Sequence, residues 1–316
     1  MASQNKYSYD PKRTGSWLVC KTCGTQFPTD DKHKVTTCLI CDDPRQYVPP
    51  SGQSFISLDV LRSTGHENIF TPIPGDHPEG RFVAINTQPK AAIGQRAILV
   101  QTPGGNILWD CVTLLDGETI RKVKDLGGLK AIVISHPHYY STHLEWARAF
   151  DCPVYLAAED AEWLTQRDAA RQVFITDVET EVSGAKVLKL GGHFTGSLVM
   201  LYEGRLLIAD TFLATPSGLG DWDADAVGAA RERPRGMSSF SFMWSYPNMI
   251  PLAPDALEQM WAILKNYEFG STYGAFPGMD IVKTPEEMKR RVLESMQIQI
   301  RHSEHGKHAM FNESVT

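Results

Sequence analysis

The chain has 316 residues, a formal net charge of -6, 42% hydrophobic residues and 22% charged residues. These proportions are typical of a globular protein, and the length predicts one large domain with an appendage. The acidic balance, without a stripe of lysine and arginine, argues against a nucleic-acid partner, and no run of about 18 apolar residues predicts a membrane span.

Four of the six cysteines stand in one tight pattern near the N-terminus. Cys20-x2-Cys23 and Cys38-x2-Cys41 are separated by fourteen residues, a spacing at which four thiolates can enclose a metal ion. We therefore expect residues 15–48 to form a four-Cys zinc knuckle, a zinc-ribbon-like module whose structural Zn²⁺ replaces a hydrophobic core. Iron in the same cage is the alternative. The paired spacing, and the lack of a signal-peptide pattern, favour a reducing, cytoplasmic compartment.

After a linker at 48–54, short apolar runs alternate with helical patterns. Strands are predicted at 81–87, 96–102, 106–111, 129–135 and 153–157, and a second series between 186 and 210. A capping box at Thr142 and Glu145 predicts a helix through about Phe150. Two later helices are expected, one with Leu257, Met260, Trp261 and Leu264 on one face and one capped by Thr284. This order predicts an α/β domain over residues 55–316, with two packed sheets flanked by helices.

Histidines gather directly after one predicted strand, in the segment ISHPHYYSTH. His136 and His138 flank Pro137, and a turn there can direct both imidazoles at one ion, which an extended strand would not. His193 lies between two predicted strands in LGGHFTGS, and Asp210 ends the apolar run LLIADTF, where an unpaired buried acid would be costly. These four residues are the candidate ligands of a zinc, iron or manganese ion. A loop of solvated histidines is the alternative.

Four motifs occur in a fixed order along the chain: WDC, SHPHYYSTH, GHFTGS and ADTF. In this order, each at a predicted strand end, they resemble the motifs of the metallo-β-lactamase-fold hydrolases over roughly residues 69 to 280. The resemblance implies an αββα sandwich and attack of metal-bound hydroxide on a carbonyl group. It assigns His136, His138 and His193 to a first metal, Asp210 to the bridging position, and Asp110 to a supporting position behind the ligands.

The sequence departs from the family pattern where that pattern holds a second metal. Tyr140 and Ser141 replace an aspartate and a histidine, His143 lies two positions late, and the stretch STYGAFPG has no histidine. The resemblance therefore implies one active-site metal, Zn²⁺ with Fe²⁺ or Mn²⁺ as alternatives. Tyr140, His143 and Asp210 are the candidate catalytic residues, with His143 as a base and Tyr140 as a donor to an oxyanion. Packing or solvated roles are the alternatives for Tyr140 and His143.

The stretch GMSSFSFMWSYPNMIP (236–251) is rich in aromatic residues and methionine. Three interpretations are open for it: one wall of an apolar pocket near the metal, a segment of the hydrophobic core, or a dimer contact. The expected function is hydrolysis of a small cyclic amide, carbamate or ester, of the lactam or lactone type, including aromatic-fused rings such as benzoxazolinones. The expected partners are a small-molecule substrate and a second copy in a homodimer. The alternatives are a mononuclear iron oxygenase of thiols or persulfides, a thioesterase, and a non-catalytic degenerate family member.

Overall fold

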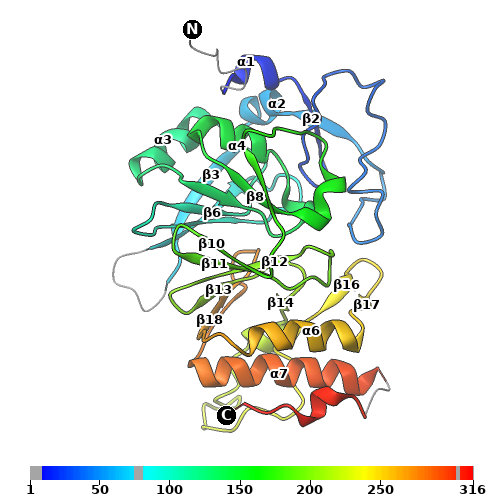
Figure 1. Cartoon of the computed structure of the whole chain (residues 1–316), viewed down its shortest axis with the longest axis vertical. Coiled ribbons are helices and arrows are strands. Elements are labelled where there is room, and N and C mark those ends of the chain that lie inside the picture. The colour runs from blue at the N-terminus through cyan, green and yellow to red at the C-terminus, as the bar shows by residue number, and fades with distance from the viewer. Residues whose placement is uncertain (1–8, 75–80, 304–306, 316) are drawn as a thin grey trace.

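Two β-sheets form the centre of the molecule, as the computed structural model of residues 9–74, 81–303 and 307–315 describes it (Figure 1). The seven-stranded sheet contains, in spatial order, β3 (Glu67–Pro72), β4 (Phe82–Gln88), β5 (Ala97–Val100), β6 (Ile107–Trp109), β7 (Ala131–Val133), β8 (Val154–Ala157) and β9 (Gln172–Ile175). The six-stranded sheet contains β10 (Glu179–Val182), β11 (Ala185–Lys189), β12 (Leu198–Tyr202), β13 (Arg205–Leu207), β18 (Ser271–Tyr273) and β19 (Asp280–Val282).

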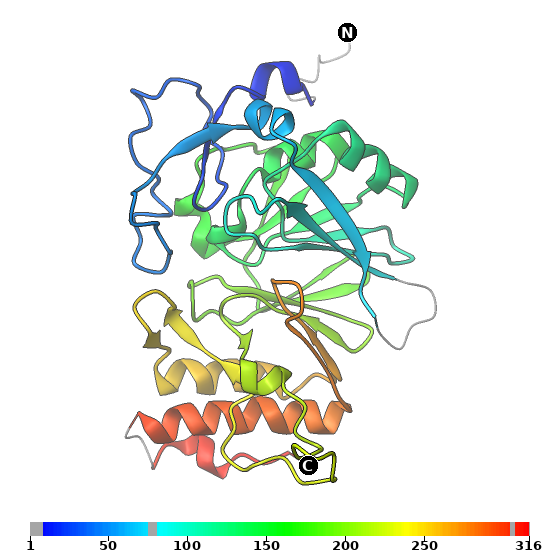
Figure 2. The same cartoon turned by 180° about the vertical axis from the view of Figure 1, so that it is seen from behind.

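The side chains of β5 alternate between two buried clusters, one on each face of the seven-stranded sheet. Ala97 and Leu99 belong to a buried cluster that includes side chains of α3 (Gly117–Asp125) and α4 (His143–Phe150), whereas Ile98 and Val100 belong to the cluster between the two sheets. Side chains two apart share one face of a strand, so one strand serves both layers. The other sheet is covered by α6 (Pro254–Leu264) and α7 (Pro285–His302). Figures 1 and 2 show the resulting order of helices, sheet, sheet and helices, which confirms the expected αββα sandwich.

Shorter elements connect these layers. They are the helices α1 (Pro11–Thr14), α2 (Leu58–Ser63) and α5 (Pro216–Leu219), the 3-10 helices η1 (Pro137–Tyr139), η2 (Ala158–Trp163) and η3 (Ala309–Asn312), and the strand pairs β1–β2 (Leu18–Cys20, Phe55–Ser57), β14–β15 (Leu213–Ala214, Phe240–Ser241) and β16–β17 (Met243–Ser245, Ile250–Pro251). No helix in the described ranges is long and apolar enough to cross a membrane.

The helix signals read from the sequence have mixed outcomes. The four apolar residues expected on one face of α6 are all buried, and the Thr284 side chain accepts the expected hydrogen bond from the Glu287 backbone N–H at the start of α7. The capping box expected at Thr142 is wrong, because its side chain accepts no hydrogen bond from the helix. The Thr142 hydroxyl instead donates to the carbonyl of Thr113 at 2.9 Å, so a tertiary contact replaces the local cap.

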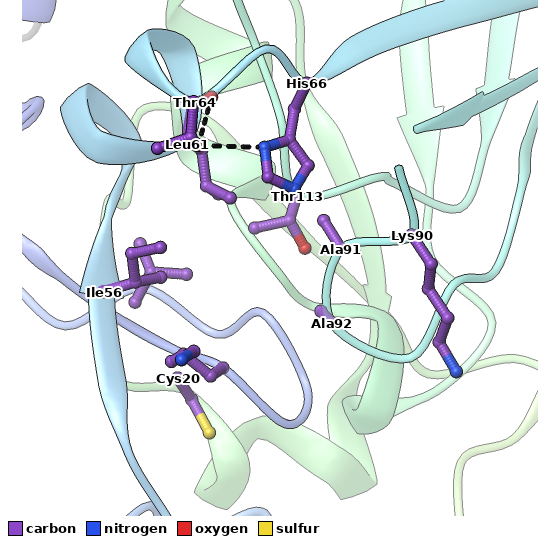
Figure 3. A pocket seen from close by; sticks show the side chains of 11 residues that line it. Cys20, Ile56, Leu61, Thr64, His66, Lys90, Ala91, Ala92 and Thr113 are labelled. Atoms are coloured by element: carbon purple, nitrogen blue, oxygen red, sulfur yellow. Dashed lines mark hydrogen bonds between the residues drawn. The ribbon is translucent and has the colours of Figure 1, made fainter. Parts of the chain in front are cut away.

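The N-terminal segment packs closely on the larger domain. β1 pairs antiparallel with β2, so the segment 48–54, expected to be a linker, is the last part of the connection 21–54 between two strands of one small sheet. Cys20, Cys23, Cys38 and Cys41 belong to the same buried cluster as Trp146 of α4. Beside this contact lies a cavity of about 430 Å³ (Figure 3). Its labelled lining residues come from both parts: Cys20, Ile56, Leu61, Thr64, His66, Lys90, Ala91, Ala92 and Thr113.

Candidate metal centre

The four N-terminal cysteines form one buried cluster. The Sγ atoms of Cys20 and Cys41 lie 3.6 Å apart, as do those of Cys23 and Cys38, and all four sulfurs lie within 4.8 Å of one another. Sulfurs at about 2.3 Å from a tetrahedral ion stand about 3.8 Å apart, whereas a disulfide needs about 2.05 Å. The cluster therefore fits a metal ion held by four thiolates. Gly24, which follows Cys23, has a φ of +84°, a conformation that glycine adopts without strain.

A second cluster joins loops from both sheets. His136 and His138 follow β7, where the chain turns into η1; His193 lies between β11 and β12; and Asp210 follows β13. His136, His138 and His193 are 2%, 2% and 0% exposed, and one ligand atom from each of the four residues lies within 4.8 Å of the other three. The structure thus brings together all four ligands expected from the sequence.

The distances in this cluster fit one ion. Oδ2 of Asp210 lies 3.4 Å from Nε2 of His136, 3.8 Å from Nδ1 of His138 and 3.9 Å from Nε2 of His193. Nε2 of His193 is 3.3 Å from Nδ1 of His138. Ligand atoms about 2.0–2.1 Å from a tetrahedral ion are about 3.3–3.4 Å apart. The two shortest separations match this value. The two longer ones exceed it, so the ligand side chains would move slightly closer together around an ion.

Hydrogen bonds on the far side of the rings hold two ligands in the correct orientation. Nδ1 of His193 lies 3.1 Å from the carbonyl oxygen of Met243, which only accepts, so this nitrogen carries the proton and Nε2 has its lone pair free for a metal. Nδ1 of His136 lies 2.9 Å from the Ser135 hydroxyl. Nε2 of His136 is buried and has no hydrogen-bond partner among the described residues. A metal ion at the cluster satisfies this atom.

The electrostatic setting also favours metal binding. Burial lowers the pKa of His138 to about 4 and also lowers the pKa of His193, which additionally faces His138. Burial opposes ionisation of Asp210, but the neighbouring histidines, led by His136, hold the pKa of its carboxyl well below its ordinary value. Near neutral pH, the lone pairs of His138 and His193 are thus unprotonated and the carboxylate is ionised. Those are the forms that bind a metal.

Two tyrosines hold Asp210. The Tyr139 hydroxyl donates to Oδ1 of Asp210 at 2.7 Å, and the Tyr246 hydroxyl donates to its backbone carbonyl at 2.9 Å. Tyr139 is fully buried, so its hydroxyl has this carboxylate as its partner without competition from bulk water. The other carboxylate oxygen, Oδ2, is the one that lies nearest to the three imidazoles. Sequence reasoning missed both tyrosines, since nothing in the motifs distinguishes Tyr139 from its neighbour Tyr140.

The other residues proposed from the sequence for catalysis are held by different partners. The Tyr140 hydroxyl donates to the carbonyl of Asp160 at 3.1 Å. His143 is buried on α4, with Nδ1 at 2.8 Å from the Tyr140 carbonyl and Nε2 at 3.0 Å from the Gln172 side chain. Burial lowers the pKa of His143 to about 4. None of these contacts reaches a ligand of the histidine cluster, so no contact supports the predicted roles of Tyr140 and His143.

Two buried acids support the ligand loops from behind. Oδ1 of Asp110 accepts the Ser135 backbone N–H at 2.7 Å, directly before His136, and burial raises the pKa of Asp110 to about 7. Oδ1 of Asp160 accepts the Gly196 backbone N–H at 3.0 Å in the loop after His193. Burial raises the pKa of Asp160 to about 6. Each acid thus fixes one of the two loops that carry histidine ligands.

The aromatic stretch 236–251 is divided between the core and the metal cluster. Phe240 and Phe242 are buried in the cluster under α6 and α7, and both rings contact Phe212. Met243 and Tyr246 instead contact His193 and Asp210. Met243 makes its contact through the backbone carbonyl and Tyr246 through its hydroxyl, so the stretch reaches the metal cluster without the side chain of Met243.

Comparison with known proteins agrees with this geometry. The model of the family described as the metallo-beta-lactamase superfamily matches residues 93–250, a range that contains all four ligands of the histidine cluster. The uncharacterized protein YmaE of Bacillus subtilis (strain 168) is 35% identical over 279 residues, covering 87% of this chain and 93% of that protein. The chain therefore belongs to the metallo-beta-lactamase superfamily.

Two solved structures resemble the chain at low sequence identity, and the first of them shares its fold. A crystal structure of VMB-1 is 12% identical, covers 75% of this chain and 98% of that chain, and has a TM-score of 0.50. A metallo-beta-lactamase from Hirschia baltica is also 12% identical, covers 72% of this chain and 97% of that chain, and has a TM-score of 0.45. Superfamily members bind divalent metals, and the residues described above fit that property.

Proposed function

We propose that this superfamily member is a mononuclear hydrolase that opens a small cyclic amide, carbamate or ester, with Zn²⁺ as its active-site ion. The proposal rests on one observation: the two carboxylate oxygens of Asp210 have different partners. Its Oδ2 faces three imidazole nitrogens, while its Oδ1 accepts the Tyr139 hydroxyl. A divalent ion held there would act as a Lewis acid on a carbonyl oxygen and would lower the pKa of a bound water to about 7.

The chain's own groups orient the reaction. Tyr139 and Tyr246 hold the side chain and the backbone of Asp210 in one position, so Oδ2 keeps a fixed direction. An ion held by the three imidazoles would have its fourth position open to water, and the ionised Oδ2 of Asp210, which lies beside them, would accept a proton from that water instead of binding the ion. The Asp210 side chain is 16% exposed, whereas the three histidine ligands are nearly fully buried. We therefore expect a substrate to approach from the side of Asp210.

Aromatic rings beside the ligands favour a flat, apolar substrate. The Phe194 ring centroid lies 4.9 Å from that of His138, Trp163 lies 5.5 Å from Phe194, and the Tyr246 ring lies 5.9 Å from His193. Trp163 and Tyr246 are partly exposed and can stack on a planar ring, whereas Phe194 is buried with Arg45 over its face and excludes water from the ligands. Lactams and lactones fused to an aromatic ring, such as benzoxazolinones, combine such a plane with a carbonyl group that the metal can polarise.

Ring opening tests the proposal directly. The Zn²⁺-loaded protein is incubated with a lactam, a lactone, a benzoxazolinone and a thioester, and the products are followed by chromatography. We expect opening of at least one cyclic substrate, and a loss of at least about a hundredfold in His136→Ala, since even residues behind a metal ligand cost 10–100-fold. Thioester cleavage alone would favour a thioesterase. Oxygen uptake by the Fe²⁺-loaded protein with a thiol would favour an oxygenase, and no turnover with the metal bound would reject the proposal.

A further inference from the structure

A residue of the N-terminal cysteine module reaches the second histidine loop. Arg45 lies four residues after Cys41, and its Nη1 donates to the backbone carbonyl of His193 at 2.9 Å. Its Nε and Nη2 donate to the two oxygens of Asp43 at 2.6 and 2.8 Å. This forked pairing fixes the plane of the guanidinium, which a lysine could not reproduce. The Arg45 side chain is only 12% exposed, so these contacts are largely shielded from water.

Aromatic rings and a second anchor enclose this contact. The guanidinium carbon of Arg45 lies 3.8 Å from the ring centroid of Phe194, with Trp163 and Trp244 at 5.3 and 5.5 Å. The Ser245 hydroxyl and the Asn248 amide both donate to the carbonyl of Pro44, at 2.6 and 2.7 Å. In Figures 1 and 2 the blue loop that follows β1 extends along the side of the molecule toward β16 and β17, where these anchors lie.

The other half of the module contacts the first histidine loop. The Gln26 backbone N–H donates to the carbonyl of Ser141 at 3.2 Å, and the Ser141 hydroxyl lies 3.0 Å from that of Thr113. Gly24 has no room for a side chain, since a Cβ there would lie 2.1 Å from the Thr113 hydroxyl and 2.9 Å from the Ser141 hydroxyl. Each Cys-x2-Cys pair is thus followed by residues that contact one of the two loops carrying histidine ligands.

We propose that the four-Cys module is part of the active-site scaffold, and that Arg45 is the positioning residue that couples occupancy of the cysteine cluster to metal affinity at His193. The cysteine-bound ion shapes the turn that ends at Arg45, and Arg45 holds the backbone of a ligand. Coupling between two binding sites is reciprocal, so filling the histidine cluster strengthens metal retention by the cysteines by the same factor. The inference rests on the proposed function only in requiring that the histidine cluster binds a metal.

The test measures metal affinity at the histidine cluster in the full chain. The cysteine cluster is first filled with Zn²⁺, weakly held metal is removed, and Co²⁺ is titrated against a competing chelator. Visible absorption of Co²⁺ bound by nitrogen and oxygen reports the histidine cluster and is separable from thiolate charge-transfer bands. We expect Arg45→Met to weaken Co²⁺ affinity about 10–100-fold, the range for groups that orient metal ligands. Arg45→Lys keeps the charge but not the fork, and should weaken affinity too.

The chain offers a matched control in Arg62. Its Nε donates to the backbone carbonyl of Leu115 at 2.8 Å and its Nη1 pairs with Asp59, so it makes the same kinds of contact away from the histidine loops. Arg62→Met should leave Co²⁺ affinity within about twofold. Unchanged affinity in Arg45→Met and Arg45→Lys, with normal Co²⁺ binding by the wild type, would overturn the inference alone. A wild type that binds no Co²⁺ at this cluster would overturn the proposed function as well.

Discussion

The hydroxyl of Tyr139 donates to Oδ1 of Asp210 at 2.7 Å, on the carboxylate oxygen that does not face the imidazoles. The phenol of Tyr139 thus binds the carboxylate that, in the family pattern, bridges two metals. Tyr139 is adjacent to Tyr140 and Ser141, the positions at which the family resemblance implies that second-metal ligands are missing.

Removing this hydroxyl should loosen the metal centre without changing the fold. Tyr139→Phe leaves Oδ1 of Asp210 buried without its donor, which costs about 1–3 kcal/mol of stability. Because Asp210 is then free to rotate, we expect metal affinity and kcat/KM to fall about tenfold or more. Chelator competition and urea unfolding measure the two effects separately.

Tyr140→Phe is the matched control, since the two tyrosines are adjacent and both are buried. Its hydroxyl donates to the carbonyl of Asp160, so we expect metal affinity to stay within about twofold and only a modest loss of stability. A loss of turnover with this variant that equals or exceeds that of Tyr139→Phe would restore the oxyanion role predicted for Tyr140 and count against the orienting role of Tyr139.

The number of metal ions bound per chain tests both clusters most directly. We predict two ions per chain in the native protein, because each cluster supplies one set of four ligand atoms. The double change Cys20→Ser/Cys23→Ser should remove one ion, and His136→Ala/His138→Ala the other, as measured by elemental analysis after gel filtration. A third ion in the wild type would mean either a binuclear centre or an ion at the exposed group Asp255, Glu258 and His308, and retention of both ions after the histidine changes would reject the histidine site.

The ligands could be predicted from the sequence because each follows an apolar run that reads as a strand, and strand ends gather at one edge of a sandwich. The neighbours of those ligands could not. Which of Tyr139 and Tyr140 faces Asp210 depends on the short 3-10 turn Pro137–Tyr139, whose direction is set by packing. The contact from Arg45 to His193 spans 148 residues of sequence, and no local pattern signals it.

Asp160 gives a pH prediction. Burial raises its pKa to about 6 from an ordinary 3.8, so the folded state holds a proton that the unfolded state releases. Its contribution to stability is therefore complete below about pH 4 and is lost as the pH rises through 6. A shift of about two units corresponds to on the order of 2–3 kcal/mol.

The Asp160→Asn variant isolates this effect, because its amide oxygen can still accept the Gly196 N–H and it carries no charge. The difference in free energy of unfolding between wild type and variant should move in favour of the variant as pH increases from 4 to 7. Urea unfolding at several pH values measures it, and parallel pH profiles for the two proteins would contradict the assignment.

The division of the stretch 236–251 between core and site predicts two different kinds of defect. Phe242 is fully buried against Phe212, so Phe242→Ala should cost about 3–5 kcal/mol of stability while the remaining folded protein keeps its metal affinity. Tyr246→Phe removes only a hydroxyl that holds the Asp210 backbone, so it should cost about 1 kcal/mol of stability yet weaken metal affinity severalfold. Thermal unfolding and chelator competition on both variants separate the two roles. Equal loss of metal affinity in both would mean that the stretch acts as one unit, because a core defect would then reach the ligands through the backbone between Phe242 and Tyr246.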